Sequence, residues 1–489
     1  MKPKLLLCEE EIRSIYQQGE EAVVALVMAL LKINTDHEER IKRLEDQIAK
    51  NSSNSNKPPS SDGFKKPTPK SLRKRHGKKS GGQAGHPGNT LKAVEKPDYT
   101  EIHRVQECRC CQSDLARVKI AGVEKRQVFD IPKVKMAVTE HQAEIKICPH
   151  CGEKNKGKFP EGVIQAVQYG IETKAVAVYF NQYQMIPLAR TKEIIEALYG
   201  QTIAEASLIS ACRDVATRTL PVSERIKAQI TRKEAVVHFD ETGVRVNGKL
   251  HWLHSASTDK LTCYAIHTKR GHKAMDDVGI LSKLQGYAIH DGWQSYFKYP
   301  VKHGLCNVHH LRRLQFLEER YPQPWVTKMN GLLKEMKETV EAAQQKGMKC
   351  LPGKQKNLFI RRYNKLLLEG YRDNPPPQRD VSQDKKRGRI KQNPARNLLE
   401  EFSVHKSAVL AFLIDLRVPF DNNQAERDVR MMKVKLKISG CFRTMVGAEI
   451  FCNIRGYIST ARKNGVNGID ALRQAFLGNP YLPDCISSG

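Results

Sequence analysis

The sequence lacks a long apolar run. Its longest stretch without a polar side chain, residues 22–31, has about ten residues, whereas a membrane-spanning helix needs about 20. The first residues carry too short an apolar segment for a secretory signal and no small-residue cleavage site. No internal repeat with a period of 20–50 residues is evident, which argues against a repeat architecture. These absences predict a cytoplasmic protein without a membrane partner.

The cysteines do not fit a disulfide scaffold. There are 13 of them, an odd number, and several fall in Cys-x-x-Cys pairs. In a chain without a secretory signal, such pairs indicate metal ligands rather than disulfides.

Negative charge is in deficit. The 489 residues include 82 Lys and Arg against 53 Asp and Glu, which gives a formal net charge of +29. Such an excess favours a polyanionic partner, with nucleic acid first and an anionic membrane surface second. The length suggests about three domains. A hydrophobic content of 40% is enough for folded cores but lean, so part of the chain is expected to be linker.

Residues 1–50 are expected to be a helical oligomerisation segment, with one long helix over residues 20–50. Two interleaved series of period seven follow a 3-4 spacing: Val27, Asn34, Ile41 and Ile48, and Val23, Leu30, His37 and Leu44. Mainly β-branched residues in one series and Leu in the other favour a parallel two-stranded coiled coil, and hence a homodimer or a higher synaptic oligomer. The alternative is an amphipathic helix packed on its own domain, because the repeat is short and His37 is a poor core residue.

Residues 51–97 are expected to form a basic disordered linker. Residues 57–79 contain nine Lys or Arg and one acid, Asp62, and large apolar side chains are nearly absent. Such a segment cannot bury enough surface to offset its ordering entropy, and its charge suits DNA phosphates. The alternative is a solvated tether. The candidate DNA-binding residues here are Lys65, Lys66, Lys70, Arg73, Lys74, Arg75, Lys78 and Lys79.

Residues 98–165 are expected to form a zinc ribbon of short strands. Cys108 and Cys111 form one Cys-x-x-Cys pair, and Cys148 and Cys151 form another after 36 intervening residues. Two such pairs can close a tetrahedral four-thiolate site around one structural Zn²⁺. The alternative is two unrelated pairs of reduced cysteines. The fourth ligand is less certain than the first three, because other donors lie nearby: His103, Cys110 and His150.

Residues 166–232 are expected to form a helical domain. Helices over 192–199 and 204–217, joined by a turn at Gly200, match a helix-turn-helix that could read DNA. This signal is weak, because any small helical domain shows two helices around a glycine.

Residues 233–317 alternate strands with turns and a helix. An apolar strand ending at Asp240 is followed by the hairpin signal Asn247-Gly248, strands over 249–257 and 261–267, a helix over 273–284 and a second apolar strand ending at Asp291. A further strand is expected near Leu305. This pattern predicts a mixed sheet in which the first and fourth strands lie side by side, which would place Asp240 and Asp291 at neighbouring strand ends. Period-2 alternation puts Glu241 on the opposite face from Asp240.

A third carboxylate lies in the last helical block, residues 401–465. Asp421 is expected to cap a helix, with Gln424 three residues on as in a capping box. The apolar stripe is Ala425, Val429, Met432 and Leu436, and a separate face carries Asn422, Glu426, Arg430, Lys433 and Lys437. One acid among bases can be a solvated salt-bridge face. It can equally be a metal-binding carboxylate on a surface that holds DNA, with Lys433 and Lys437 as further DNA-binding candidates.

Three converging carboxylates repel one another unless cations neutralise them. Two Mg²⁺ ions, or Mn²⁺, are the usual solution and perform phosphoryl transfer. Asp240, Asp291 and Glu426 are therefore candidate metal ligands.

Motifs along essentially the whole chain carry a resemblance. They are Asn51-Ser-Ser-Asn-Ser-Asn-Lys-Pro-Pro-Ser-Ser-Asp62, Gly81-Gly-Gln-Ala-Gly-His86, the four-cysteine segment, His238-Phe-Asp240-Glu-Thr, His290-Asp291-Gly, Cys306-x-x-His309-x-x-Arg312 and Val418-Pro-Phe-Asp421-Asn-Asn-Gln-Ala-Glu426-Arg-Asp-Val-Arg430. The sequence resembles the IS66-type insertion-sequence transposases, which have an RNase H-like DDE catalytic domain. The last motif is long and unusual, which makes the resemblance specific.

The resemblance implies roles for several residues and partners. It makes Asp240, Asp291 and Glu426 the catalytic triad, places His309 and Arg312 near the scissile phosphate, and suggests support from Asn422 and Arg430. Residues 318–400 would be a basic helical insertion in a catalytic domain formed by 233–317 and 401–465, and 466–489 a C-terminal tail. It also implies a prokaryotic, nucleoid-associated protein with accessory proteins of the same element.

The sequence thus predicts a multidomain α+β DNA transposase. It would bind the terminal inverted repeats of an insertion sequence, hydrolyse one phosphodiester at each end and join the freed 3′-hydroxyl to target DNA. Two alternatives stay open: a zinc-ribbon DNA-binding regulator, which would not need the acids, and an RNase H-like nuclease without integration activity.

Overall fold

The computed structural model describes residues 8–55, 57, 62, 91–132, 134–232, 235–377 and 392–487. The eight candidate DNA-binding lysines and arginines of residues 65–79 and the basic run 385–389 lie outside the described residues. Their roles therefore stay predictions.

A five-stranded mixed sheet forms the centre of the molecule. Strands β3 (Val236–Val246), β4 (Lys249–Ser257) and β5 (Thr262–His267) form an antiparallel meander. Strand β6 (Tyr287–His290) pairs in parallel with β3, and β7 (Lys302–Leu305) pairs in parallel with β6. The strand order β5-β4-β3-β6-β7 confirms the predicted neighbourhood of the first and fourth strands. The predicted hairpin turn is also present, with positive φ at Asn247 and Gly248.

Helices cover both faces of this sheet. On the face of Val237 and Phe239 lie α3 (Ile171–Val178), α5 (Glu205–Ile230), α14 (Met445–Lys463) and α15 (Gly468–Phe476), all in one apolar core. Val244 and Val246 point to the other face by alternation, and there they pack against α13 (Asn423–Ile438). Burial on both faces explains why β3 begins with apolar residues and why β6 is mostly apolar.

Two of the expected boundaries differ from the structure. Helix α5 begins as predicted after Gly200 and α4 (Leu188–Tyr199), but it continues to Ile230 because its apolar side chains pack on the sheet. The predicted helix-turn-helix segment thus shares a core with the sheet. The predicted C-terminal tail contains α15, in which Leu472 and Phe476 are buried in that same core, followed by α16 (Asp484–Ser487).

Short elements join these layers. A π-helical turn (Tyr179–Tyr183) follows α3, and α6 (His272–Val278) follows β5. Helix α6 is shorter than predicted because Gly279 adopts a left-handed conformation and ends it. Single 3₁₀ turns lie at Leu281–Lys283 and Tyr296–Lys298.

A helical subdomain with its own core follows β7. It comprises α7 (Asn307–Arg320), α8 (Pro324–Gln345), α9 (Gly353–Asp373), α10 (Pro394–Val404), α11 (Lys406–Val409) and α12 (Ala411–Ile414). Trp325, Tyr363 and Phe402 are completely buried in it. This confirms the helical character predicted for 318–400 in its described residues, 318–377 and 392–400. The core also includes Ile289 of β6 and Leu305 of β7, so the subdomain is anchored on the sheet.

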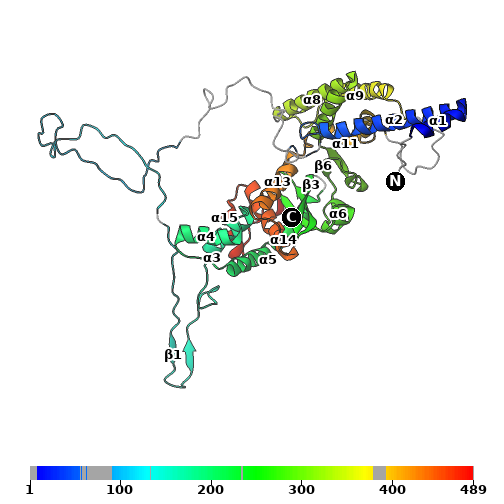
Figure 1. Ribbon diagram of the computed structural model, residues 1–489. Helices are drawn as coiled ribbons and strands as arrows, with labels where there is room; N and C mark the ends of the chain where they lie inside the picture. The colour runs from blue at the N-terminus through cyan, green and yellow to red at the C-terminus, as the bar shows by residue number, and fades with distance from the viewer. Residues whose placement is uncertain are drawn as a thin grey trace.

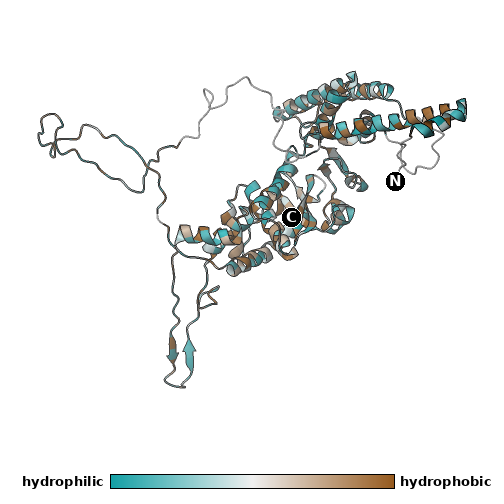
Figure 2. Cartoon of the chain, viewed as in Figure 1, coloured by the Kyte–Doolittle hydropathy of each residue, from teal (hydrophilic) through white to brown (hydrophobic). Residues whose placement is uncertain are grey.

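The N-terminal segment forms α1 (Glu9–Gln17) and the long helix α2 (Glu20–Ala49), which confirms one helix over residues 20–49. Helix α2 runs beside the helical subdomain (Figure 1), where Arg320 and Tyr321 hydrogen-bond to Asp46. Apolar side chains along the rest of α2 are exposed, among them Val27, Leu30, Ile41, Leu44 and Ile48. The ribbon of α2 accordingly shows brown, hydrophobic segments in Figure 2. Such a surface fits a helix that needs a partner, and the coiled coil stays a prediction.

Residues 91–165 run in extended excursions away from the body (Figure 1). Only β1 (Ile145–Ile147) and β2 (Lys154–Lys156) pair there, around the second cysteine pair. The first pair has one isolated bridge, between Glu107 and Asp114, instead of the expected strands. Among the helices of the described ranges, none is both long and apolar enough to cross a membrane.

Candidate functional site: a carboxylate cluster on the central strands

The pairing of β3 with β6 brings the first two acids side by side. Val236 pairs with Tyr287 and His238 with Ile289, an offset of 51 residues that is also the separation between Asp240 and Asp291. Asp291 follows directly after the last residue of β6. The sequence suggested that Asp240 ends its strand, and this is wrong. Strand β3 continues to Val246 in its pairing with β4. Asp240 lies instead level with the end of β6, and beyond this point the described structure has only the isolated bridge between Val246 and Phe442 on that edge of β3.

The third acid, Glu426, lies in the first turn of α13, and this turn is bound to β3 by Asn422. The side chain of Asn422 is buried; its Nδ2 donates to the Phe239 carbonyl oxygen over 2.8 Å, and its Oδ1 lies 2.8 Å from His238 Nδ1. The predicted cap is therefore wrong. The N-cap is Asn422 rather than Asp421, and its side chain bonds to β3 instead of to the helix.

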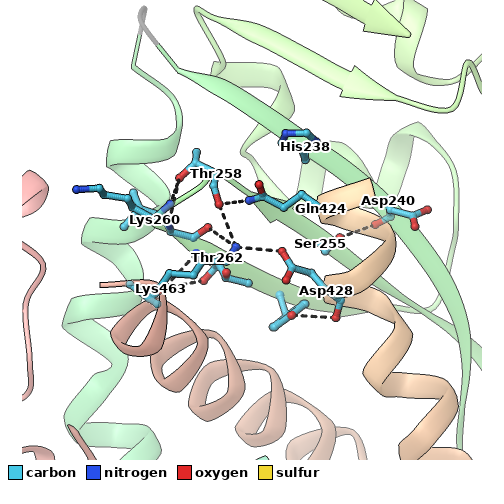
Figure 3. A network of polar contacts seen from close by, with 12 residues as sticks. His238, Asp240, Ser255, Thr258, Lys260, Thr262, Gln424, Asp428 and Lys463 are labelled. Carbon is cyan, nitrogen blue, oxygen red and sulfur yellow. Dashed lines mark hydrogen bonds and ion pairs between the residues drawn. The ribbon is translucent and has the colours of Figure 1, made fainter. Parts of the chain in front are cut away.

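A second set of contacts holds the opposite side of α13 (Figure 3). Gln424 Nε2 donates to the Thr258 carbonyl oxygen at the turn between β4 and β5, so it does not complete a capping box. Lys463 of α14 donates to the same oxygen over 3.0 Å and to Asp428 over 3.0 Å. The helix that carries Glu426 is thus fixed to β3 on one side and to the β4–β5 turn on the other.

The three acids lie close enough to change one another's ionisation. Burial raises the pKa of Asp240 well above its ordinary value, and the charges of Glu241, Asp291 and Glu426 raise it further. Burial also raises the pKa of Glu426, where Asp421 and Asp291 add to the shift and Arg312 and Arg430 oppose it. In the described part of the chain, neither Asp240, Asp291 nor Glu426 forms a salt bridge with a lysine or arginine.

The neighbouring acid Glu241 differs in this respect. It points to the other face of β3, as alternation predicted, and forms a salt bridge of 2.7 Å with Arg270. The Tyr296 hydroxyl donates to Glu241 over 2.6 Å. Glu241 therefore has a salt-bridge partner that Asp240 lacks, although burial and the charge of Asp291 still raise the pKa of Glu241.

Sequence reasoning missed the surroundings of Arg270. Its guanidinium lies over two indole rings, 4.9 Å from the Trp252 centroid and 4.3 Å from the Trp293 centroid. Both tryptophans flank the acids in sequence, which was an available signal, but their meeting depends on the hairpin β4–β5 and on the turn after Asp291.

The first turn of α7 approaches Glu426 from the helical subdomain. His309 Nε2 lies 3.8 Å from Glu426 Oε1, and Cys306, the N-cap of α7, lies beside both. Burial and the nearby Arg312 lower the pKa of His309 to about 4, so the imidazole is neutral at pH 7. Burial raises the pKa of the Cys306 thiol to about 12. His309 and Arg312 thus belong to the cluster, as the motif suggested.

A basic face of α13 extends from the cluster. Arg430, Lys433 and Lys437 follow Glu426 along the helix, and all three are exposed. Val429 and Met432 are buried against the sheet, which confirms the predicted apolar stripe at these positions. The surface leading away from the acids therefore carries positive charge.

The two cysteine pairs form local knuckles of the same kind. The first cysteine of each pair, Cys108 or Cys148, donates its N–H to the carbonyl oxygen five residues on and accepts from the N–H four residues on. The residue after each second cysteine, Gln112 or Gly152, has a positive φ. Hydrogen bonds lower the pKa of Cys111 to about 7 and also lower that of Cys148.

These thiols therefore suit a thiophilic metal such as Zn²⁺. The structure does not bring the two pairs together, because no group of three or more of these cysteines with their sulfur atoms close enough to share a metal ion occurs among the described residues.

Family models cover most of the chain. Residues 106–152 match the zinc-finger binding domain of transposase IS66, so this region is a zinc finger. Residues 9–92 match a family of unknown function (DUF6444). No curated protein matches the chain. Residues 166–450, more than half of the chain, match the transposase IS66 family and contain Asp240, Asp291 and Glu426. The chain therefore belongs to the IS66 family of transposases.

Proposed function

We propose that this transposase cuts DNA at the terminal inverted repeats of an insertion sequence and joins the freed 3′-hydroxyl ends to target DNA. The observation that carries the proposal is the meeting of Asp240, Asp291 and Glu426 without a salt bridge to a lysine or arginine among the described residues, although Arg312 and Arg430 lie near Glu426. Buried carboxylates in this condition repel one another and favour a bound cation.

The donor set fits Mg²⁺ or Mn²⁺. Three carboxylates offer only oxygen, which hard divalent cations prefer, and all three residues are half-buried rather than sealed from solvent. Asp240, Asp291 and Glu426 would hold two such ions. When bound, a metal pair supplies activation of the attacking water or 3′-hydroxyl and stabilisation of the leaving oxygen.

The chain's own residues position the reactants. Asn422 and Gln424 fix the turn that carries Glu426, and Arg312 and Arg430 offer positive charge beside it for the scissile phosphate. His309, neutral and beside Glu426, can hydrogen-bond to a phosphate oxygen or to water. Lys433 and Lys437 would bind the DNA backbone beyond the cut, since phosphate contacts supply most of the sequence-independent affinity.

The N-terminal half would recognise the ends. We infer that Cys108, Cys111, Cys148 and Cys151 share one structural Zn²⁺ when both knuckles close on it, and that α4 and α5 and the basic linker contact DNA. Two or more protomers, paired through α2, would hold the two ends of the element, with accessory proteins of that element.

A cleavage assay on a labelled terminal repeat tests the proposal. With Mg²⁺ the protein is expected to nick the repeat end and to join it to a second duplex. Asp240→Asn, Asp291→Asn and Glu426→Gln should each abolish cleavage and leave end binding intact. An active Asp240→Asn protein would overturn the assignment. Cleavage without any joined product would instead indicate a nuclease.

A further inference from the structure

A second group of metal-binding donors adjoins the carboxylate cluster. Cys306, His309 and Glu426 each offer one ligand atom, and these atoms all lie within 4.8 Å of one another, the single such group of His, Cys, Asp or Glu in the described ranges. Neighbouring ligand atoms in a tetrahedral zinc site lie roughly 3.3–3.7 Å apart, given bond lengths of about 2.0–2.3 Å. The 3.8 Å between His309 Nε2 and Glu426 Oε1 is close to this spacing.

We propose that Cys306, His309 and Glu426 form a Zn²⁺ site that withdraws Glu426 from the magnesium-binding cluster. Thiolate, imidazole and carboxylate together are a donor set for zinc, whereas Mg²⁺ avoids sulfur and nitrogen. On binding, the thiol proton of Cys306 leaves to solvent as the sulfur–zinc bond forms. Three protein ligands leave a fourth position for water.

The two α7 donors are held ready by the start of that helix. Cys306 is its N-cap and His309 lies three residues on, so both side chains project from the same turn. The backbone N–H of Asn422 lies 3.3 Å from Cys306 Sγ and donates to it, an arrangement that supports a thiolate.

The imidazole of His309 is not held by another protein group. Its Nδ1 is buried without a hydrogen-bond partner, within the part of the chain that the structure describes. The nitrogen that faces Glu426 is Nε2, and no hydrogen bond of the ring fixes either nitrogen elsewhere, so Nε2 is available as a metal ligand. Zinc binding would therefore break no protein contact of this ring.

The site is partly open to solvent. The Cys306 side chain is buried, but those of His309 and Glu426 are 14% and 29% exposed, so an ion can enter from the side of the acids. Glu426 is the shared residue. A Zn²⁺ ion held by the thiolate of Cys306 and the imidazole of His309 would compete with Mg²⁺ for the Glu426 carboxylate, so zinc would act as an inhibitor. This consequence rests on the proposed function; the binding itself does not.

Cobalt substitution tests the binding directly. The full chain is loaded with one equivalent of Zn²⁺ to fill the zinc finger and is then titrated with Co²⁺, whose thiolate complexes absorb in the near ultraviolet. A cobalt–thiolate band is expected in the wild type and in Cys452→Ala, which removes another buried cysteine away from this group. The band should be lost in Cys306→Ala. No band in the wild type, or an unchanged band in Cys306→Ala, would overturn the proposal.

A second variant guards against misfolding. His309→Gln should weaken Co²⁺ binding at least about tenfold while the thermal unfolding temperature stays near that of the wild type. If both Cys306→Ala and His309→Gln keep wild-type affinity, the site does not exist. Inhibition is measured separately: Zn²⁺ should slow Mg²⁺-dependent cleavage, and about ten times more Zn²⁺ should be needed with Cys306→Ala, relative to its own uninhibited rate. Failure of cleavage in every protein would count against the proposed function and leave the cobalt result standing.

Discussion

His238 Nδ1 and Asn422 Oδ1 lie 2.8 Å apart and join the central strand to the helix that carries Glu426. Because Asn422 Nδ2 donates to the Phe239 carbonyl, its Oδ1 is an acceptor, and His238 must carry its proton on Nδ1. Burial lowers the pKa of His238, so the ring is neutral at pH 7. The pair lies two residues from Asp240 along β3 and one helical turn from Glu426.

We expect Asn422→Ala to reduce cleavage more than it reduces stability. The change leaves the His238 N–H and the Phe239 carbonyl without partners, which costs about 1–3 kcal/mol, and it loosens the turn that positions Glu426. A loss of about 100-fold in cleavage rate, with end binding retained, is expected. Asn423→Ala, an exposed neighbour, is the matched control and should behave as the wild type. Equal rates for the two variants would contradict a positioning role for Asn422.

Asp240→Asn and Glu241→Gln should shift stability in opposite directions without metal. Asp240 is an uncompensated acid among acids, so its replacement should stabilise the metal-free protein by roughly 1 kcal/mol. Glu241 is paired with Arg270 and Tyr296, so its replacement should cost about 1–2 kcal/mol. Thermal unfolding with and without Mg²⁺ measures both. The added stability from Mg²⁺ should vanish only in Asp240→Asn; destabilisation of metal-free Asp240→Asn would count against a strained carboxylate cluster.

The proximity of Asp240 and Asp291 was predictable, because each residue follows an apolar segment of the kind found in central strands, and central strands lie side by side. The position of Asp240 within its strand was not, because the continuation of β3 depends on its pairing with β4. The start of α13 was also misplaced. The local pattern favoured Asp421 and Gln424 as caps. In the structure Asn422 bonds to β3 and Gln424 bonds to the turn between β4 and β5. The spacing of residues within one segment cannot predict contacts with residues so far away in sequence.

The helices of 166–232 show the same limit. Their apolar stripes predicted a buried face, but an apolar stripe alone does not indicate which other elements pack against it. Residues of α5 pack on α14 and β5, which are about 50 to 250 residues away in sequence.

Glu401 should make stability depend on pH in the acid range. Burial alone would raise the pKa of this carboxyl, but hydrogen bonds and charge from His310 and Arg313 outweigh it and lower the pKa to about 2. A carboxyl whose folded pKa lies below its unfolded value of about 4.3 stabilises the protein above that value and loses this contribution as pH falls from about 4 to 2.

Glu401→Gln should therefore destabilise the protein by roughly 1–3 kcal/mol at pH 7 and by little near pH 2. Denaturant unfolding at several pH values measures this difference. The exposed Glu193→Gln on α4 is the control. A difference that stays constant down to pH 2 would rule out Glu401 ionisation as its source.

The zinc content of cysteine variants tests whether the two knuckles act together. If they share one ion, the double variants Cys108→Ser with Cys111→Ser and Cys148→Ser with Cys151→Ser, each made in Cys306→Ala so that only the zinc finger is counted, should reduce the zinc content from one ion per chain to nearly none, because two thiolates alone hold zinc weakly. Elemental analysis after dialysis measures it, with Cys110→Ser as the control. Half an equivalent or more retained in either variant would show that the pairs bind separately.

Charge in the apolar seam of α2 should separate protomers. Val27→Asp combined with Leu30→Asp places two acids in the exposed apolar stripe, away from the contact with Arg320. Light scattering should then give a monomer where the wild type gives a dimer or larger assembly. Ala29→Asp, outside the seam, should leave the assembly unchanged. A monomeric wild type would refute pairing through α2.

Helix α7 has a further consequence. Its first turn places His309 beside Glu426, and its last residue, Arg320, is bound to Asp46 of α2. Fourteen helical residues span about 20 Å, and a helix of this length transmits movement as a stiff rod. Helix α2, which would bring two protomers together, therefore contacts one end of α7, and Glu426, which would take part in cutting DNA, lies at the other end. If α2 pairs protomers and the carboxylates cut DNA as proposed, a shift of α2 would reach Glu426 through α7 without passing through the sheet.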